Sequence, residues 1–262
     1  MTPIDGRHGG PASGSSPRPL EGKVALVTGG GQGVGLGIAR ALVAAGARVA
    51  LVDREAGRVA EAARAIDALA LVGDVVVPGD AVRCCDEAVA RLGGLDVLVN
   101  NAHQVIGQPL LEVDDASLET VWSTGFLGTF NFMKAARPHL RRGASIVNVV
   151  SSVMLKTDTS GFALYAATKT AIRSMTRTLA CEWGRDGIRV NALSPQTESP
   201  AWKTWSAANP ALAAKILSEI PVGYVGDAER DVGPVAVFLA SDAARYVTGS
   251  LVLADGGRGQ LR

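Results

Sequence analysis

The sequence predicts an α/β fold in a single domain, a doubly wound parallel sheet with helices on both faces. Short runs of β-branched and aliphatic residues alternate with alanine-rich stretches of helical periodicity from Lys23 onward. Strands that are apolar at every position are typical of parallel sheets, because helices cover both faces of such sheets. The length of 262 residues allows one large domain with a substantial core.

The first half of the chain contains four strand and helix pairs. Gly46 is expected to end the first helix, since glycine readily adopts the left-handed conformation found after helices. Asp53 ends the second strand. The predicted strands cover residues 24–27, 49–52, 71–75 and 95–99, and the predicted helices cover 37–45, 55–70, 79–92 and 114–140.

The second half continues the alternation without a linker or a repeat. Predicted strands cover 145–150, 188–193 and 250–253, and predicted helices cover 162–183 and 228–240. Residues 196–222 are expected to be irregular and helical by turns. Residues 1–20, rich in Gly, Pro and Ser, are interpreted as a flexible N-terminal tail, which leaves residues 21–262 as the single domain.

The composition excludes several classes of function. The formal net charge of +1 gives no sign of a nucleic-acid partner. No apolar run of about 18 residues is present and the N-terminus lacks an apolar stretch, so no membrane span and no secretion are expected. Cys84, Cys85 and Cys181 lack metal-ligand spacing, so no metal site is predicted, and reduced thiols fit a cytoplasmic location.

A glycine-rich loop, TGGGQGVG at residues 28–35, lies between the first strand and the first helix. Glycines allow a tight turn and let backbone N–H groups approach a pyrophosphate, while the helix N-terminus supplies partial positive charge. The position in a strand–loop–helix unit favours a dinucleotide site over a simple turn. The predicted contacts are Gly29, Gly31, Gln32, Gly33, Val34 and Gly35.

Asp53 indicates which dinucleotide is bound. An acidic residue at the end of the second strand typically hydrogen-bonds the ribose 2′-hydroxyl of NAD and repels the 2′-phosphate of NADP. Arg54 is adjacent and would favour that phosphate, but the glycine loop contains no basic residue. NAD is therefore the expected cofactor, and NADP is disfavoured. Asp53 would also serve as a cap of the following helix.

Tyr165 and Lys169 form a Tyr-x-x-x-Lys pair in a predicted helix, which places both side chains on one face. A cation beside a phenol favours the phenolate and lowers a pKa that is ordinarily about 10. Such a tyrosine can exchange protons near neutral pH. Alone, this spacing is common on solvated helix faces. The glycine-rich loop and the upstream Ser152 favour the catalytic interpretation.

The motifs together resemble the short-chain dehydrogenase/reductase family over about residues 20–257, nearly the whole expected domain. The matching segments, in family order, are TGGGQGVG (28–35), Asp53, the Gly-Asp-Val of 73–75, LVNNA (98–102), Ser152, YAATK (165–169), GIRVNALSP (187–195) and FLASD…VTG…DGG (238–257). The resemblance implies a Rossmann-like fold and hydride transfer between a nicotinamide cofactor and an alcohol or carbonyl substrate.

The resemblance also implies residue roles. Asp74 and Val75 would contact the adenine, and Asn101 with Ala102 would lie against the adenosine ribose. Lys169 would hydrogen-bond the nicotinamide ribose. Ser152 would polarise the substrate oxygen, and Tyr165 would exchange the proton of its hydroxyl. The other interpretation of Ser152 is an ordinary serine of a strand-end turn.

Two departures from the family pattern lie beside this expected site. Gly125 replaces the asparagine of the long fourth helix, which in the family helps hold a water of the proton relay, so an altered relay is expected. His103 replaces the glycine that usually follows Asn-Asn-Ala. Its imidazole would act as a proton shuttle or substrate contact, or it would point to solvent from a strand end.

A third departure is the segment 194–200, where Gln196 follows Pro195 in place of the usual glycine. The family uses this segment to contact the nicotinamide carboxamide and to begin a mobile lid. Thr197 or Ser199 would replace the missing contacts. Trp202 and the nearby Trp205 would wall an apolar substrate pocket, or pack the lid onto the body or a subunit contact.

Three functional interpretations remain open from the sequence. The intact Ser152, Tyr165 and Lys169 favour an NAD-dependent dehydrogenase or reductase of a small or cyclic secondary alcohol or ketone. Gly125, His103 and Gln196 favour a nicotinamide-dinucleotide-binding protein with weak turnover. Altered chemistry without net redox change, such as isomerisation, is the third. The family is commonly tetrameric through helices 114–140 and 162–183, so a homo-oligomer, tetramer or dimer, is expected.

Overall fold

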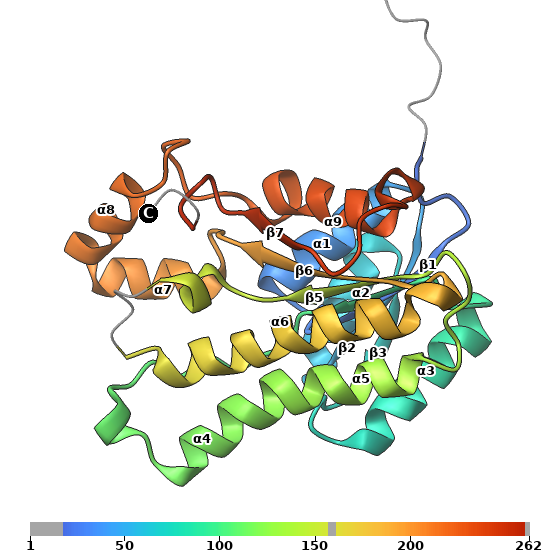
Figure 1. Cartoon of the computed structure of the whole chain (residues 1–262), viewed down its shortest axis with the longest axis horizontal. Helices are drawn as coiled ribbons and strands as arrows, with labels where there is room; N and C mark the ends of the chain where they lie inside the picture. The colour runs from blue at the N-terminus through green and yellow to red at the C-terminus, as the bar shows by residue number, and fades with distance from the viewer. Residues whose placement is uncertain (1–17, 157–160, 260–262) are drawn as a thin grey trace, which may run out of the picture.

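The computed structural model describes residues 18–156 and 161–259, which form a seven-stranded parallel sheet between two layers of helices (Figure 1). The strand order is β3-β2-β1-β4-β5-β6-β7. The strands are β1 (Val24–Thr28), β2 (Arg48–Asp53), β3 (Leu69–Val72), β4 (Val97–Asn100), β5 (Ser145–Val149), β6 (Arg189–Pro195) and β7 (Leu251–Ala254). The prediction of a doubly wound parallel sheet is confirmed.

Each face of the sheet is covered by a separate hydrophobic core. One core lies under α1 (Gly33–Ala44), α2 (Ala56–Ile66) and α9 (Gly233–Ala240). The other lies under α3 (Pro78–Leu92), α5 (Gly128–Ala136) and α6 (Ala163–Trp183). The inner strand β1 is buried at every residue, as a continuous apolar run in a parallel sheet requires.

The longest predicted helix is interrupted. It consists of α4 (Asp115–Trp122), a π-helical segment at Ser123–Leu127 and α5, which ends at Ala136, before Pro138. Single π-helical turns within helices mark places where the helical hydrogen-bond ladder is opened, often at functional sites.

The ends of several helices and strands differ by a few residues from the predicted ends. Helix α1 begins at Gly33 rather than 37, and residues 69–70 belong to β3 rather than to the preceding helix. Strand β3 ends at Val72 because the Asp74 N–H turns to the Asp80 carboxylate. The region 196–222 contains two helices, α7 (Pro200–Ala208) and α8 (Pro210–Ser218).

The expected N-terminal tail falls mainly outside the described residues, which begin at 18. Leu20, at the end of that expected tail, is fully buried, and its N–H donates to the Ala45 carbonyl at 2.9 Å. The ordered body therefore includes Leu20.

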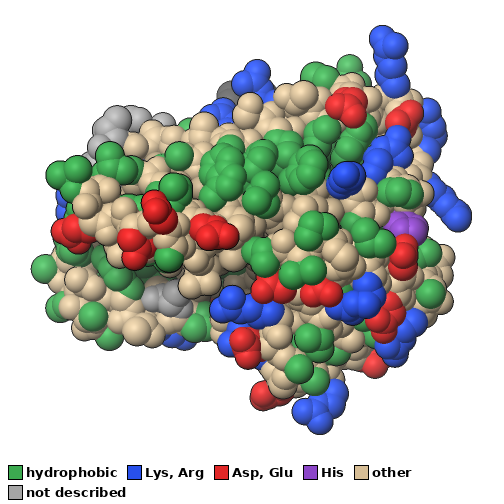
Figure 2. Space-filling view, turned by 90° about the horizontal axis from the view of Figure 1, so that it is seen from below, with side chains coloured by type: hydrophobic (Ala, Val, Ile, Leu, Met, Phe, Trp, Pro, Cys, Tyr) green, Lys and Arg blue, Asp and Glu red, His purple; other side chains and the backbone are tan. Residues whose placement is uncertain are grey.

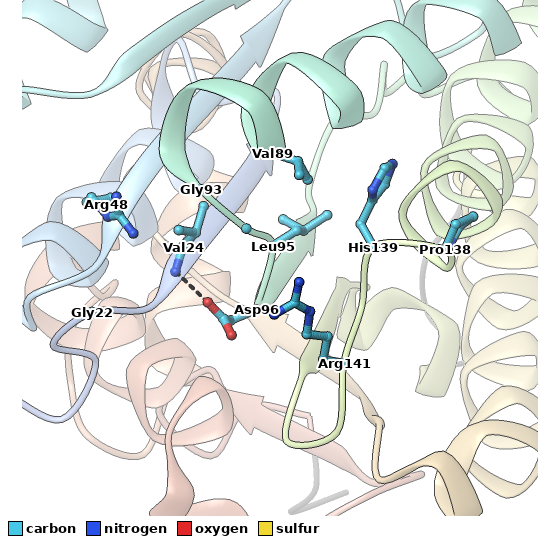
Figure 3. A pocket seen from close by; sticks show the side chains of 11 residues that line it. Gly22, Val24, Arg48, Val89, Gly93, Leu95, Asp96, Pro138, His139 and Arg141 are labelled. Atoms are coloured by element: carbon cyan, nitrogen blue, oxygen red, sulfur yellow. Dashed lines mark hydrogen bonds between the residues drawn. The ribbon is translucent and has the colours of Figure 1, made fainter.

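The two ends of the sheet differ in character. At the amino ends of the strands, a cavity of about 220 Å³ is lined in part by Arg48, His139 and Arg141 (Figure 3). The predicted site residues do not line this cavity. They lie at the carboxyl ends of the strands, where ligands bind in open α/β sheets, and α7 and α8 project beyond this end (Figure 1).

Candidate active site

The glycine loop packs too tightly for side chains. Gly29 and Gly33 have φ values of +62° and +57°, a region that L side chains rarely adopt. A β-carbon on Gly35 would lie 2.3 Å from the Gly29 carbonyl oxygen. Helix α1 therefore starts directly against the loop, with Gln32 as an N-cap residue that makes no side-chain cap. A helix N-terminus favours anions, so the first N–H groups of α1, with that of Val34 among them, are available for the predicted pyrophosphate contact.

Asp53 is buried beside this loop at the end of β2. Its Oδ2 accepts a 3.3 Å hydrogen bond from the Gly31 N–H, and its Oδ1 accepts one from the Glu55 N–H at 3.1 Å. A β-carbon on Gly31 would lie 2.7 Å from the carboxylate. Through these two hydrogen bonds the carboxylate holds the backbone of the glycine loop and the backbone at the start of α2 in place.

A basic residue that sequence reasoning missed lies at the same place. Arg58 Nη1 is 3.5 Å from Asp53 Oδ1, whereas Arg54 pairs loosely with Glu55 at 3.8 Å. Arg58 lies in α2, and its stem reaches the Gly31 position. In the sequence, Arg58 can be recognised only as a basic residue five positions after Asp53, just inside the following helix. Both an acid and a base therefore lie where the adenosine ribose is expected.

The remaining predicted cofactor residues lie along the carboxyl edge of β3 and β4. Asp74 Oδ1 accepts from the Val76 N–H at 3.1 Å, and the Val75 carbonyl accepts from the Asn131 side chain at 3.0 Å. The Asn101 amide donates to the Thr28 and Gly29 carbonyls at 3.0 and 3.1 Å. The Asn101 side chain thus links the two loops.

Tyr165 and Lys169 lie on one face of α6, as predicted. Lys169 Nζ lies 5.5 Å from the Tyr165 ring centroid and donates to the Val149 carbonyl at 2.8 Å. Burial lowers the pKa of Lys169 to about 7. Burial raises the pKa of Tyr165 to about 12, although a hydrogen bond with Ser151 opposes this rise. The predicted lowering of the tyrosine pKa is therefore absent, because desolvation outweighs the effect of Ser151.

Two adjacent serines, Ser151 and the predicted Ser152, follow β5 near Tyr165. The Ser151 hydroxyl opposes the rise in the pKa of Tyr165, and it accepts from the Val153 N–H at 3.3 Å. Ser152 is buried in the short 3₁₀ turn Ser152–Leu155, with its β-carbon 2.9 Å from where a β-carbon on Gly259 would lie. The backbone turn after β5 directs adjacent serines to different surroundings.

His103 points into the site and does not face solvent. Its ring stacks on the Tyr165 ring at a centroid distance of 5.0 Å and an interplanar angle of 27°. The Phe162 ring packs edge-on against the same Tyr165 ring at a centroid distance of 6.3 Å. A β-carbon on Gly125 would lie 2.5 Å from His103 Nε2. The two departures from the family pattern therefore occupy one space: the histidine is present where the glycine leaves room for it.

The lid region lies over the cofactor loop. Pro200, which begins α7, would lie 3.7 Å from a β-carbon on Gly33. Ser199 caps α7 by accepting from the Trp202 N–H at 3.1 Å. The half-buried Trp202 packs on Trp205 with ring centroids 5.4 Å apart. The lid helix is thus anchored at its start beside the expected pyrophosphate site.

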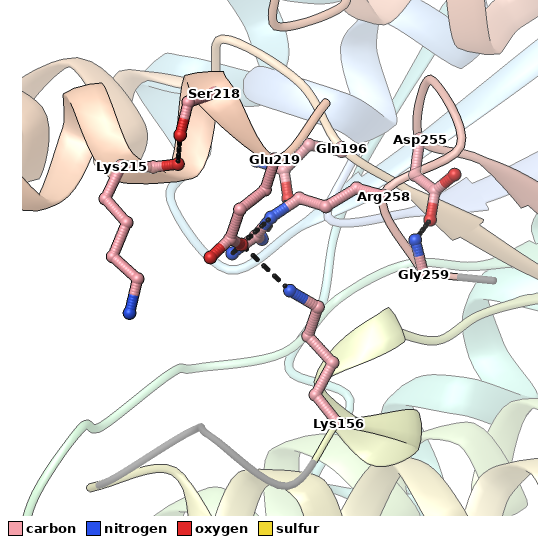
Figure 4. A network of polar contacts seen from close by, with 8 residues as sticks. All are labelled: Lys156, Gln196, Lys215, Ser218, Glu219, Asp255, Arg258 and Gly259. Atoms are coloured by element: carbon pink, nitrogen blue, oxygen red, sulfur yellow. Dashed lines mark hydrogen bonds and ion pairs between the residues drawn. The ribbon is translucent and has the colours of Figure 1, made fainter. Parts of the chain in front are cut away.

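A buried ionic network joins the lid to the body (Figure 4). The Glu219 carboxylate, just after α8, is 3.1 Å from Lys156 Nζ and 3.2 Å from Arg258 Nη2. Arg258 also donates to the Gln196 side chain at 3.1 Å. Burial opposes ionisation of Glu219, but the hydrogen bonds and charges of Lys156 and Arg258 together hold its pKa below the usual value. The Gln196 side chain is thus a hydrogen-bond acceptor within this network.

The comparisons with known proteins agree on one family. The sequence model described as enoyl-(acyl carrier protein) reductase matches residues 29–258. L-fucose dehydrogenase of Rattus norvegicus is 36% identical over 242 residues, which cover 90% of this chain and 89% of the relative. Galactitol 2-dehydrogenase (L-tagatose-forming) of Cereibacter sphaeroides is 37% identical over 244 residues, covering 91% and 95%. The chain belongs to the short-chain dehydrogenase/reductase family.

A solved member of this family supports the same fold. The crystal structure of a short chain dehydrogenase from Burkholderia cenocepacia J2315 in complex with NADP has a TM-score of 0.85 and 30% sequence identity, and the match covers 92% of this chain and 99% of that one. The resemblance found in the sequence motifs is thus confirmed. The named relatives are dehydrogenases, which supports an oxidoreductase.

The described residues contain no group of three or more His, Cys, Asp or Glu arranged to hold a metal ion. Within the same ranges, none of the helices is both long enough and apolar enough to cross a membrane.

Proposed function

We propose that this protein transfers a hydride between NAD(H) and a secondary alcohol or the corresponding ketone. The observation that carries the proposal is the placement of Tyr165 and Lys169 on one face of α6, with the adjacent serines Ser151 and Ser152 in the turn after β5, at the carboxyl ends of the strands. Residues 101–103 connect this group to the glycine loop, because Asn101 bonds the loop and His103 stacks on Tyr165.

Each residue has a defined part in the proposed reaction. When bound, the nicotinamide supplies the hydride chemistry. Tyr165 takes the hydroxyl proton during oxidation and returns it during reduction, while Ser152, or the adjacent Ser151, hydrogen-bonds the same oxygen. The protonated form of Lys169 stabilises the phenolate of Tyr165, and Lys169 also hydrogen-bonds the nicotinamide ribose. Burial raises the pKa of Tyr165 to about 12, so proton exchange near neutral pH requires a nearby positive charge, which the protonated Lys169 would supply.

The proposal keeps NAD as the preferred cofactor. The Asp53 carboxylate is buried at the edge where the adenosine ribose is expected, and burial strengthens its repulsion of a 2′-phosphate. Arg58 would favour NADP instead, since a guanidinium 3.5 Å from the acid would also attract that phosphate. Asp53 is the more buried of the two and is held by two backbone N–H groups, so the preference is expected to follow the acid.

The substrate is proposed to be a small secondary alcohol or ketone. The relatives named as L-fucose and galactitol dehydrogenases make sugars and polyols the first class to test. Trp202 is proposed to wall the substrate pocket from the lid.

The proposed assembly is a homo-oligomer, dimer or tetramer, with a second copy of this chain on the helical face of α4–α6. Figure 2 shows hydrophobic side chains gathered on the lower face of the molecule. Leu118, Trp122, Leu127 and Phe130 of α4–α5 are exposed. Large exposed apolar patches mark association sites. A cytoplasmic location is proposed from the three free cysteines at 84, 85 and 181, which fit a reducing compartment.

The test is a panel of secondary alcohols, sugars and polyols, and the matching carbonyls, assayed by nicotinamide absorbance with NAD and NADP in parallel. The expected result is NAD-linked turnover that disappears in Tyr165→Phe, while calorimetry still shows cofactor binding to the variant. Cofactor binding without turnover across the whole panel would count against the dehydrogenase function and favour a binding role.

A further inference from the structure

His103 is enclosed between two helical elements. On one side its ring stacks on Tyr165 of α6 at 5.0 Å. On the other side its Nε2 lies 3.0 Å from the Val121 carbonyl, at the end of α4. The next residue is fastened as well, because the Gln104 N–H donates to Thr124 Oγ1 at 3.1 Å. The imidazole therefore has a fixed position between the π-helical segment and the phenol.

The hydrogen bond at Nε2 determines the tautomer. A carbonyl oxygen can only accept, so Nε2 must carry the hydrogen, and Nδ1 of a neutral ring must present a lone pair. Burial, with a further contribution from the charge of Lys169, lowers the pKa of His103 to about 2, so the ring is neutral at physiological pH. Nδ1 is thus an acceptor over the whole working range of an enzyme.

This acceptor lacks a partner within the part of the chain that the structure describes. Nδ1 is buried, and none of the described residues hydrogen-bonds it. Buried polar atoms in native proteins are nearly always satisfied by protein, water or ligand. Nδ1 belongs to a ring stacked on Tyr165, so its missing donor lies beside the proton-exchanging group.

The room for this ring comes from Gly125. A β-carbon there would lie 2.5 Å from His103 Nε2 and 2.6 Å from the Thr168 methyl group. Any residue larger than glycine would displace the imidazole or the helix. The pair His103–Gly125 is therefore a packed unit, and Gly125 lies within the π-helical segment at residues 123–127.

We propose that His103 is a positioning residue of the proton-exchange site, whose Nδ1 accepts a hydrogen bond from an O–H donor next to Tyr165 and Lys169. The donor is water or a second hydroxyl of the substrate. This inference rests on the proposed dehydrogenase function. The donor oxygen, held on Nδ1, can accept from the Lys169 ammonium, which stabilises its charged form and through it the phenolate of Tyr165.

Two conservative variants separate the two nitrogens of His103. The amide of asparagine places a polar atom near the position of Nδ1, whereas that of glutamine reaches the position of Nε2. We expect His103→Gln to lower kcat about tenfold, the effect of one lost hydrogen bond in a buried site, and to move the acidic limb of its pH profile to higher pH. His103→Asn should retain more activity. An unchanged kcat and pH profile in His103→Gln would overturn the proposal, as would a less active His103→Asn.

The substrate panel distinguishes the two donors. If water is the donor, His103→Gln lowers kcat equally for a mono-alcohol and for a polyol. If a substrate hydroxyl is the donor, the loss is confined to polyols.

A second measurement decides the inference without turnover, so that its failure is separable from failure of the proposed function. The chain has three histidines, and ¹⁵N imidazole spectra assigned with His103→Gln and His139→Gln isolate the His103 signals. We expect a neutral Nε2–H ring with a hydrogen-bonded Nδ1. A protonated ring, the opposite tautomer or a free Nδ1 lone pair would overturn the proposal.

The packing unit itself is tested by a double-mutant cycle on thermal unfolding. Gly125→Asn alone should be destabilising because of its contact with the ring. His103→Gly should relieve part of that loss, so that the double variant is more stable than the sum of the single changes predicts. Additive effects would contradict a shared space.

Discussion

The packing of Gly35 gives a quantitative test of the cofactor loop. Gly35 lies in the first turn of α1, and a β-carbon there would lie 2.3 Å from the Gly29 carbonyl oxygen and 2.5 Å from the Asn101 side-chain nitrogen. The first of these atoms belongs to the backbone, so it cannot move aside as a flexible side chain would. Gly35→Ala must therefore push α1 away from the loop.

The expected cost follows from two opposing effects. Overpacking a tight contact costs about 1–3 kcal/mol, while alanine gains up to about 1 kcal/mol over glycine within a helix. We expect a net loss of about 2 kcal/mol, which for a domain of this size lowers Tm by about 4–8 °C. Affinity for NAD should also fall, because the displaced loop supplies the pyrophosphate site.

Gly57→Ala is the matched control. Gly57 lies in the first turn of α2, it is exposed, and no atom lies within 4 Å of its added β-carbon. This variant should be as stable as the wild type or more stable, with unchanged NAD binding. The assays are thermal unfolding by circular dichroism and NAD titration by calorimetry. Equal stability and affinity in both variants would refute the close packing of α1 on the loop.

Three further changes have expected outcomes. Ser151→Ala and Ser152→Ala should differ clearly in kcat under saturating cofactor, so that steady-state kinetics assign the catalytic role to one serine; equal losses would contradict a single catalytic serine. Asp53→Ala should weaken NAD and relax discrimination against NADP, whereas Arg58→Ala should weaken NADP alone; the ratios of kcat/KM for the two cofactors check both. Glu219→Gln should cost about 3 kcal/mol at neutral pH, since it leaves two buried cations without their anion. The folded-state pKa of Glu219 is lowered, so its contribution is present above about pH 4.3 and is lost as pH falls through that lower pKa. Unfolding midpoints of the two proteins should therefore converge in acid, and a constant difference down to about pH 2 would contradict the network.

Much of the fold could be predicted because it depends on local patterns. Continuous apolar strands, alternating helices and the glycine loop determine a doubly wound parallel sheet and place its ligand site at the carboxyl ends. The interruption of the long helix could not be predicted in the same way. The interrupted segment includes Gly125, which packs beside His103 from another part of the chain, and helical periodicity does not report such packing.

The site shows a similar division. The spacing of Tyr165 and Lys169 predicts their common helix face, and the structure places them there. Counting along the chain could not show how the turn after β5 places its two serines, of which Ser151 affects the pKa of Tyr165 and Ser152 is buried. The pKa of Tyr165 was also beyond sequence reasoning, since burial depends on the whole surrounding structure.

The most direct test of the account follows the hydride itself. A secondary alcohol found in the panel is synthesised with deuterium on its carbinol carbon and incubated with the enzyme and NAD, and the reduced nicotinamide is analysed by mass spectrometry. The account predicts that deuterium appears in the nicotinamide with the wild-type protein and not with Tyr165→Phe. Substrate conversion that leaves the nicotinamide without deuterium, or equal transfer by the Tyr165→Phe variant, would contradict it.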